Sequence, residues 1–238
     1  MTDRSKRRCL LISNSTNYGE GYLDHCAEAL REILDGRDRL AFVPFALHDR
    51  QGYGRRAAER FATLGVEAVT LTADDPGRAL LAEVPAVFVG GGNTFRLLDA
   101  LQTSGLLDVL RHRARDDLVY SGASAGANIA APTIRTTNAM PIVEPASFAS
   151  LGLIGFQINP HYLDPQPGSE HMGETRQQRL EEFLEANDVP VVGLREGAWL
   201  RVVGEEIRLG GRRDARVFRR GEAPAERSPG EHLQGLEG

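Results

Sequence analysis

A turn of small residues around Ser124 is the stretch of this sequence best suited to catalysis. Ser124 is the central residue of Gly-Ala-Ser-Ala-Gly (122–126), which follows an apolar run over 117–121 and leads into small residues over 125–131. A serine on so sharp a turn between strand and helix presents its hydroxyl at the sheet edge, as in the G-x-S-x-G nucleophile elbow. A helix N-terminus beside it favours negative charge. The pattern predicts a nucleophilic serine, and a Gly-rich turn without a catalytic role is the alternative.

His161 is the candidate base for this serine. A serine hydroxyl attacks an amide when a base, normally a histidine oriented by a carboxylate, takes its proton. Of the six histidines, His161 ends an expected strand (157–162), while the others lie in polar loops, on polar helix faces or near the C-terminus. Its place after an Asn-Pro pair fits a general base and fits a structural turn residue equally well.

The carboxylate that would orient this base has two candidates. Glu196 follows the apolar run 191–194, at the expected end of a strand. Asp164 lies nearer to His161 along the chain, in a loop that contains proline and glycine. An exposed turn glutamate would suit the position of Glu196 as well, and the spacing does not decide between the two acids.

Backbone N–H groups near the serine are the candidates for an oxyanion hole, which needs two donors directed at one point. Ala125, directly after the serine, supplies one of them. Gly91 and Gly92 lie in a triple-glycine turn after an apolar run and are the candidates for the second. Glycine lets the backbone approach a substrate closely, and it also permits a tight turn, so the two roles are compatible.

Apolar runs alternate with helical spacings along the first half of the chain, which predicts the frame that positions these residues. Strands are expected over residues 9–13, 40–45, 66–71, 86–89 and 117–121. Helices are expected over residues 23–34, 55–64, 75–83, 95–101 and 106–115. This alternation predicts an α/β fold in which helices cover both faces of a mostly parallel sheet, with the site off the carboxyl ends of its strands.

The second half of the chain differs in character. Residues 133–156 are rich in threonine, proline and small residues, which predicts irregular structure. A helix is expected over 174–187 and a strand over 191–194, and a small antiparallel meander is expected over 199–203, 206–209 and 215–218. We expect a single domain over 1–221 and a polar, loosely held C-terminal tail over 222–238.

Composition excludes several classes of function. The chain has 238 residues, 41% of them hydrophobic, and a formal net charge of −5, which gives no electrostatic case for nucleic acid or an anionic membrane as partner. Cys9 and Cys26 are expected to be buried thiols, and no zinc pattern is present, so we expect neither metal nor cofactor. The first apolar run is too short for a signal peptide. A cytoplasmic protein, monomeric or homodimeric, is the expectation.

Five segments of the sequence together resemble serine peptidase family S51, the α-aspartyl dipeptidases. They are Gly-Gly-Gly-Asn-Thr-Phe (90–95), Gly-Ala-Ser-Ala-Gly-Ala-Asn (122–128), Pro-Thr-Ile-Arg-Thr-Thr-Asn (132–138), Ile-Asn-Pro-His (158–161) and Gly-Glu-Thr-Arg (173–176). The likeness extends over about residues 8–221. It implies a class I glutamine amidotransferase-like three-layer sandwich and a serine exopeptidase that cleaves after an N-terminal aspartate.

The resemblance also implies roles for particular residues. Ser124 matches the nucleophile of the family, His161 its general base and Glu196 the glutamate regarded as the third member of a Ser-His-Glu triad. Gly92 and Ala125 match the oxyanion positions. No metal or cofactor is implied, and the implied partner is a small peptide with an N-terminal aspartate.

Recognition of an acidic substrate requires a cation, and arginine binds carboxylates through two hydrogen bonds. Arg176 and Arg135 are the candidates, and the alternative is that both are surface or capping arginines. Asn93 is a weaker candidate for the pocket wall.

One position departs from the resemblance. The family often has an aspartate after Thr-Thr-Asn, whereas this chain has Ala139, so we expect Glu196 to orient the base.

Two other functions stay open at this point. One is a cyanophycinase-like hydrolase of β-linked aspartyl peptides, which shares the superfamily. The other is a non-catalytic protein that binds a small molecule on the same fold, which Ala139 makes conceivable. A panel of α- and β-linked substrates distinguishes the first from an α-aspartyl dipeptidase, and labelling of Ser124 by a phosphonate distinguishes the second.

Overall fold

The computed structural model describes residues 6–165, 168 and 173–237. Its strands are β1 (Arg8–Ile12), β2 (Arg39–Val43), β3 (Glu67–Thr70), β4 (Ala86–Val89), β5 (Val119–Ala123), β6 (Gln157–Pro160), β7 (Val191–Leu194), β8 (Ala198–Val203), β9 (Glu206–Gly211), β10 (Ala215–Phe218) and β11 (Ala225–Arg227). Its helices are η1 (Asp24–Cys26), α1 (Ala27–Leu34), α2 (Arg50–Ala62), α3 (Asp75–Glu83), α4 (Thr94–Thr103), α5 (Leu106–Asp116), α6 (Ala125–Asn128) and α7 (Arg176–Ala186).

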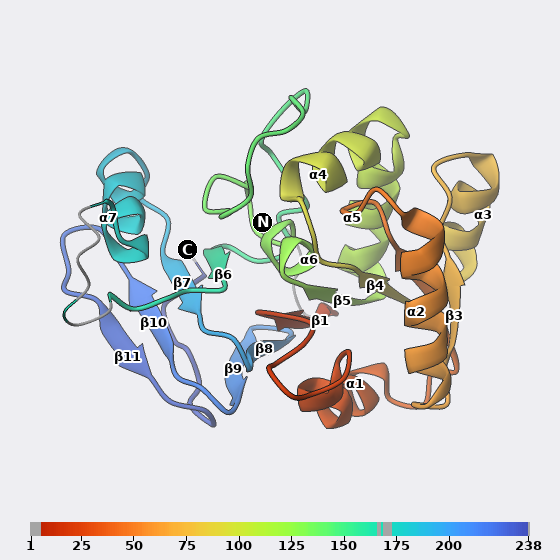
Figure 1. Ribbon diagram of the computed structural model, residues 1–238, viewed down its shortest axis with the longest axis horizontal. Helices are drawn as coiled ribbons and strands as arrows, with labels where there is room; N and C mark the ends of the chain where they lie inside the picture. The colour runs from red at the N-terminus through yellow and green to blue at the C-terminus, as the bar shows by residue number, and fades with distance from the viewer. Residues whose placement is uncertain (1–5, 166–167, 169–172, 238) are drawn as a thin grey trace.

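A seven-stranded sheet with the order β3-β2-β4-β5-β1-β8-β9 forms the centre of the molecule (Figure 1). Strands β1 to β5 pair in parallel, and β8 and β9 add an antiparallel hairpin beside β1. Parallel strands with apolar side chains on both faces require cover on both sides. The predicted α/β fold with a mostly parallel sheet is therefore confirmed.

Two apolar cores lie on opposite faces of this sheet, because successive side chains of a strand point to opposite sides. Leu10 and Ile12 of β1 pack with α1 and α2 on one face. Cys9 and Leu11 pack with the apolar side chains of α3, α4, α5 and α6 on the other. The result is a three-layer arrangement of helices, sheet and helices.

A second sheet with the order β11-β10-β7-β6 lies at one end of the molecule together with α7 (Figure 1). Strands β6 and β7 are parallel, whereas β7, β10 and β11 pair antiparallel. The expected meander is thus divided, since β8 and β9 join the large sheet and β10 joins the small one. The pairing of Ala215 with Leu194 joins two segments distant in sequence, which local spacing does not report.

The C-terminal segment also differs from its expectation as a loosely held tail. Strand β11 pairs with β10, and the Leu233 N–H donates to the Ile207 carbonyl (2.8 Å). Leu233 and Leu236 are buried in the core over the large sheet. These apolar side chains stand in an otherwise polar stretch, and their burial holds it in place.

Helix length bears on membrane association. Across the described part of the chain, every helix is too short or too polar to cross a membrane.

Candidate active site

The turn between β5 and α6 has the geometry of a nucleophile elbow. Ser124 has φ 54° and ψ −110°, a backbone conformation that L-residues rarely adopt. A Cβ at Gly122 would lie 2.5 Å from the backbone of Gly126, and a Cβ at Gly126 would lie 2.1 Å from the Val89 carbonyl oxygen. The glycines of the motif are therefore required for the close approach of α6 to β4 and β5.

His161 connects the serine to a carboxylate. It follows β6 with φ 55°, and its Nε2 lies 2.8 Å from the Ser124 Oγ. Its Nδ1 lies 2.6 Å from Oε1 of Glu196, which stands in the loop between β7 and β8. The imidazole thus joins hydroxyl and carboxylate in one hydrogen-bonded line, as a serine nucleophile requires.

Asp164, the second candidate acid, is engaged elsewhere. The Arg195 guanidinium donates to both of its carboxylate oxygens, from Nε at 2.7 Å and from Nη2 at 2.8 Å. These bonds hold the pKa of the Asp164 carboxyl below its ordinary value. Arg195 also binds Glu226 on β11, so Asp164 belongs to an ion-pair network on the second sheet. The geometry places Glu196 and not Asp164 on the imidazole.

The triple-glycine turn after β4 passes beside the serine. A Cβ at Gly91 would lie 3.1 Å from the Ser124 Cβ. The Gly91 N–H donates to the Tyr53 hydroxyl (2.8 Å), so it is already paired. Gly92 is exposed and has φ 137°, and the next N–H, that of Asn93, bonds to the Ala46 carbonyl. The N–H groups on either side of Gly92 are thus both paired within the protein.

Tyr53 is a residue of this site that sequence reasoning missed. It lies on α2, is 4% exposed and has Tyr22 as a neighbour, whose hydroxyl donates to it at 3.5 Å. Burial raises the pKa of Tyr53, so its hydroxyl stays protonated at neutral pH. An apolar ring at helical spacing predicts a core residue, and the sequence carries no signal for its bond to Gly91.

Arg176 is the candidate arginine that lies near the hydrogen-bonded line of Ser124, His161 and Glu196. It is half-buried at the start of α7, and its Nη1 donates to the Asn138 Oδ1 (2.7 Å). Asn138 in turn donates to the carbonyl of Pro160, the residue before the base. Among the residues that the structure describes, the Arg176 guanidinium forms no ion pair with a carboxylate, and the charged group that acts on it is Arg179. Arg135, the other candidate, has an exposed side chain in the segment after α6.

Partial burial and the nearby Arg179 lower the pKa of Arg176 from its ordinary value. A guanidinium remains charged at neutral pH despite such a shift. Arg176 is therefore a half-buried cation that a substrate carboxylate would pair.

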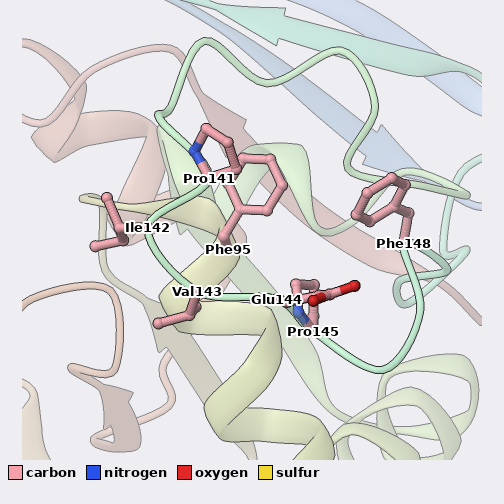
Figure 2. A pocket seen from close by; sticks show the side chains of 7 residues that line it. All are labelled: Phe95, Pro141, Ile142, Val143, Glu144, Pro145 and Phe148. Carbon is pink, nitrogen blue, oxygen red and sulfur yellow. The ribbon is translucent and has the colours of Figure 1, made fainter.

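An apolar cavity of about 400 Å³ lies between α4 and the segment that follows Asn138 (Figure 2). Its lining is Phe95, Pro141, Ile142, Val143, Glu144, Pro145 and Phe148. Asn93 connects this segment to the glycine turn. The Asn93 Oδ1 caps α4 by accepting the Arg96 N–H (3.0 Å), and its Nδ2 donates to the Met140 carbonyl (2.8 Å). Both polar groups of this expected pocket-wall residue are thus engaged within the protein.

A bound metal ion requires several suitable side chains close together. Among the residues that the structure describes, no group of three or more histidine, cysteine, aspartate or glutamate side chains is arranged to hold a metal ion. Cys9 and Cys26 are buried free thiols, and burial raises the pKa of each to about 12.

Comparison with known proteins places the chain in a family. The model of peptidase family S51 matches residues 9–210. The chain belongs to peptidase family S51. A peptidase E from Streptomyces coelicolor is 56% identical over 227 residues, which cover 95% of this chain and 93% of that protein. A probable alpha-aspartyl dipeptidase from Drosophila melanogaster is 44% identical, with coverage of 90% and 91%.

Solved structures agree on the fold of this S51 peptidase. A peptidase from an acI-B1 actinobacterium superposes with a TM-score of 0.73 at 17% identity, over 98% of both chains. A putative peptidase E from Listeria monocytogenes superposes with a TM-score of 0.65 at 22% identity, over 87% of this chain and 99% of that one. At these identities the likeness supports the fold alone.

Proposed function

We propose that this S51 peptidase is a serine dipeptidase that hydrolyses the peptide bond after an N-terminal aspartate, with Ser124, His161 and Glu196 as its catalytic triad. The observation that carries the proposal is the continuous line from the Ser124 Oγ through the His161 ring to the Glu196 carboxylate, at 2.8 and 2.6 Å. The names of relatives in two kingdoms, peptidase E and probable alpha-aspartyl dipeptidase, support the substrate class.

The triad performs two proton transfers in each half of the reaction. His161 Nε2 takes the proton of the Ser124 hydroxyl as Oγ attacks the carbonyl carbon of the aspartyl residue. The imidazolium then gives this proton to the leaving amine, and the aspartyl group stays on Ser124 as an ester. Water repeats the sequence on the ester and releases aspartate. Glu196 keeps Nδ1 protonated and stabilises the imidazolium.

The oxyanion of each tetrahedral intermediate is the next group that needs a partner. The N–H groups of Gly92 and Ala125 are its proposed donors, one from the turn after β4 and one from the first residue of α6. The conformation of Gly92 matters here, since a Cβ at this position would lie 2.7 Å from the Ala46 carbonyl oxygen. Any residue larger than glycine would displace the donor.

Arg176 is the proposed partner of the aspartyl side chain. It is half-buried and charged, and a buried substrate carboxylate needs such a cation. It is also close to the proposed base, because it donates to Asn138, which in turn donates to the Pro160 carbonyl. Arg135 is exposed, which supports Arg176 over it.

The test compares hydrolysis of Asp-Leu and Leu-Leu by the wild type and by Ser124→Ala. We expect cleavage of Asp-Leu by the wild type, little cleavage of Leu-Leu, and a loss of ~10⁶-fold in kcat for Ser124→Ala, as for a serine triad without its nucleophile. Equal rates for the two proteins would refute the proposal. Asp-Leu with a β-linkage completes the panel, because cleavage of that substrate alone would identify a β-aspartyl hydrolase instead.

A further inference from the structure

The catalytic line crosses the boundary between the two sheets. Ser124 follows β5 in the seven-stranded sheet. His161 follows β6 in the second sheet, and Glu196 lies in the loop that leads from β7 of that sheet to β8 of the large one. The hydrogen bonds of the triad therefore depend on how firmly the two sheets are held to each other at this point.

Residues at the carboxyl end of β1, close to the centre of the molecule in Figure 1, make the connection. The Ile12 carbonyl accepts the N–H of Ser124 (2.9 Å). The Ser13 hydroxyl accepts the N–H of His161 (3.0 Å) and donates to the Leu194 carbonyl (2.7 Å). Ser13 is fully buried, so one hydroxyl satisfies a donor and an acceptor that belong to the second sheet.

Asn14 holds the loop that carries Glu196 in the same way. Its Oδ1 accepts the N–H of Gly197, the residue directly after Glu196, at 2.7 Å. Its Nδ2 donates to the Thr16 carbonyl (2.9 Å) and to the Asn17 Oδ1 (2.7 Å), which fixes the orientation of the amide. Asn14 is 2% exposed, and water therefore offers no replacement for these bonds.

We infer that Ser13 and Asn14 are positioning residues that set the His161 ring and the Glu196 carboxylate against Ser124. The inference rests on the proposed function of the triad. It explains how His161 keeps φ 55°, an unfavourable conformation that persists only where surrounding bonds fix it. Both side chains are buried, and each binds the backbone beside the group that it positions.

The first experiment replaces the Ser13 hydroxyl. Ser13→Ala leaves the His161 N–H unpaired and removes one of the two donors to the Leu194 carbonyl, which keeps the Tyr162 N–H (3.1 Å), so the base is freer to move. Misplacement of a catalytic group by about 1 Å lowers kcat by ~10²-fold, so we expect a 10- to 100-fold lower kcat for Asp-Leu with KM within about twofold. Ser13→Cys, a milder variant with a weakly bonding thiol, keeps the test open if the alanine variant does not fold.

Ser150→Ala is the matched control for stability. Ser150 is also buried (4% exposed), and its hydroxyl donates to the Ala131 carbonyl (2.6 Å), which also accepts the Gly152 N–H, so this bond holds no residue of the proposed triad. We expect it to lower Tm about as much as Ser13→Ala while kcat stays at the wild-type level. A kcat for Ser13→Ala and Ser13→Cys no lower than that of Ser150→Ala would overturn the inference.

A spectroscopic readout separates this inference from the proposed function, because it needs no substrate. The His161 Nδ1 lies 2.6 Å from the Glu196 Oε1, and we expect the proton between them to give a low-field NMR resonance that Glu196→Gln identifies. We expect Ser13→Ala and Asn14→Ala to weaken or shift this resonance and Ser150→Ala to leave it intact. An unchanged resonance in both variants would overturn the positioning role even if Asp-Leu proved not to be the substrate.

Discussion

Glu196→Gln, compared with Asp164→Asn, is the substitution pair that tests the site most directly. Glutamine has nearly the shape of glutamate, but its amide also offers N–H donors. If the amide donates to the His161 Nδ1, the ring proton moves to Nε2 and points at Ser124, so the imidazole no longer accepts the serine proton. The variant therefore retains the fold and the pocket while it loses the base.

The expected loss of kcat in Glu196→Gln depends on how exposed the His161 and Glu196 side chains are. Replacement of a buried triad carboxylate by its amide lowers kcat by about 10⁴-fold. The side chains of His161 and Glu196 are 37% and 53% exposed, so water screens their interaction and replaces part of it. We expect kcat to fall by ~10²- to 10³-fold, with KM for Asp-Leu little changed, because Glu196 stabilises the transition state and not bound substrate.

Asp164→Asn is the control for this pair. It removes the charge that Arg195 binds, which weakens the ion-pair network on the second sheet and lowers Tm. Its carboxylate does not contact the imidazole, so kcat should stay within about threefold of wild type. Steady-state kinetics and thermal unfolding of both variants decide the matter. A loss of kcat in Asp164→Asn equal to that in Glu196→Gln would refute the assignment of Glu196.

Three further outcomes are expected. Tyr53→Phe removes the acceptor of the Gly91 N–H and should lower kcat for Asp-Leu about tenfold, with KM unchanged, because the loop that presents the oxyanion donor loosens. Arg176→Gln should raise KM for Asp-Leu and reduce its kcat/KM at least ~10²-fold, while the rate of phosphonate labelling at Ser124 changes little. The pKa values of Cys9 and Cys26, raised to about 12, keep both thiols protonated, so iodoacetamide at pH 8 should modify neither until the protein unfolds, as mass spectrometry would show.

The parallel half of the fold could be predicted because each strand carries its own signal. Strands buried on both faces are continuous apolar runs, and the expected range 86–89 coincides with β4. The helix expected over 75–83 coincides with α3, which Asp74 caps and which has Pro76 in its first turn. Such features are local, and local features are what a single sequence reports.

The second half was harder because its pairings are not local. Strands β8, β9 and β10 follow one another with short connections, which favours a meander. In the structure β10 instead lies between β7 and β11, where Val217 is buried, and its pairing with β7 joins segments that are distant in the sequence. The polar composition after Gly221 likewise concealed two leucines that dock on the large sheet.

In the site, too, some residues could be predicted from local sequence, whereas others depend on contacts between distant segments. Ser124 could be predicted, since small residues around a serine after a strand report a specific turn. The choice between Glu196 and Asp164 could not, because both follow strand ends and neither spacing nor residue type says which carboxylate faces the imidazole. In the structure Arg195 binds the Asp164 carboxylate, which leaves Glu196 as the acid on the imidazole. This contact joins residues 31 positions apart.

The hydrogen bonds of the His161 ring are complete without an aspartate at position 139. Nδ1 of His161 is bonded to Glu196, and Nε2 lies against Ser124, so both ring nitrogens have their partners. An acid at position 139 would find no free nitrogen on the base, and the backbone of Ala139 already donates to the Thr137 hydroxyl (3.2 Å). The proposed proton relay through Glu196 therefore needs no second carboxylate at position 139.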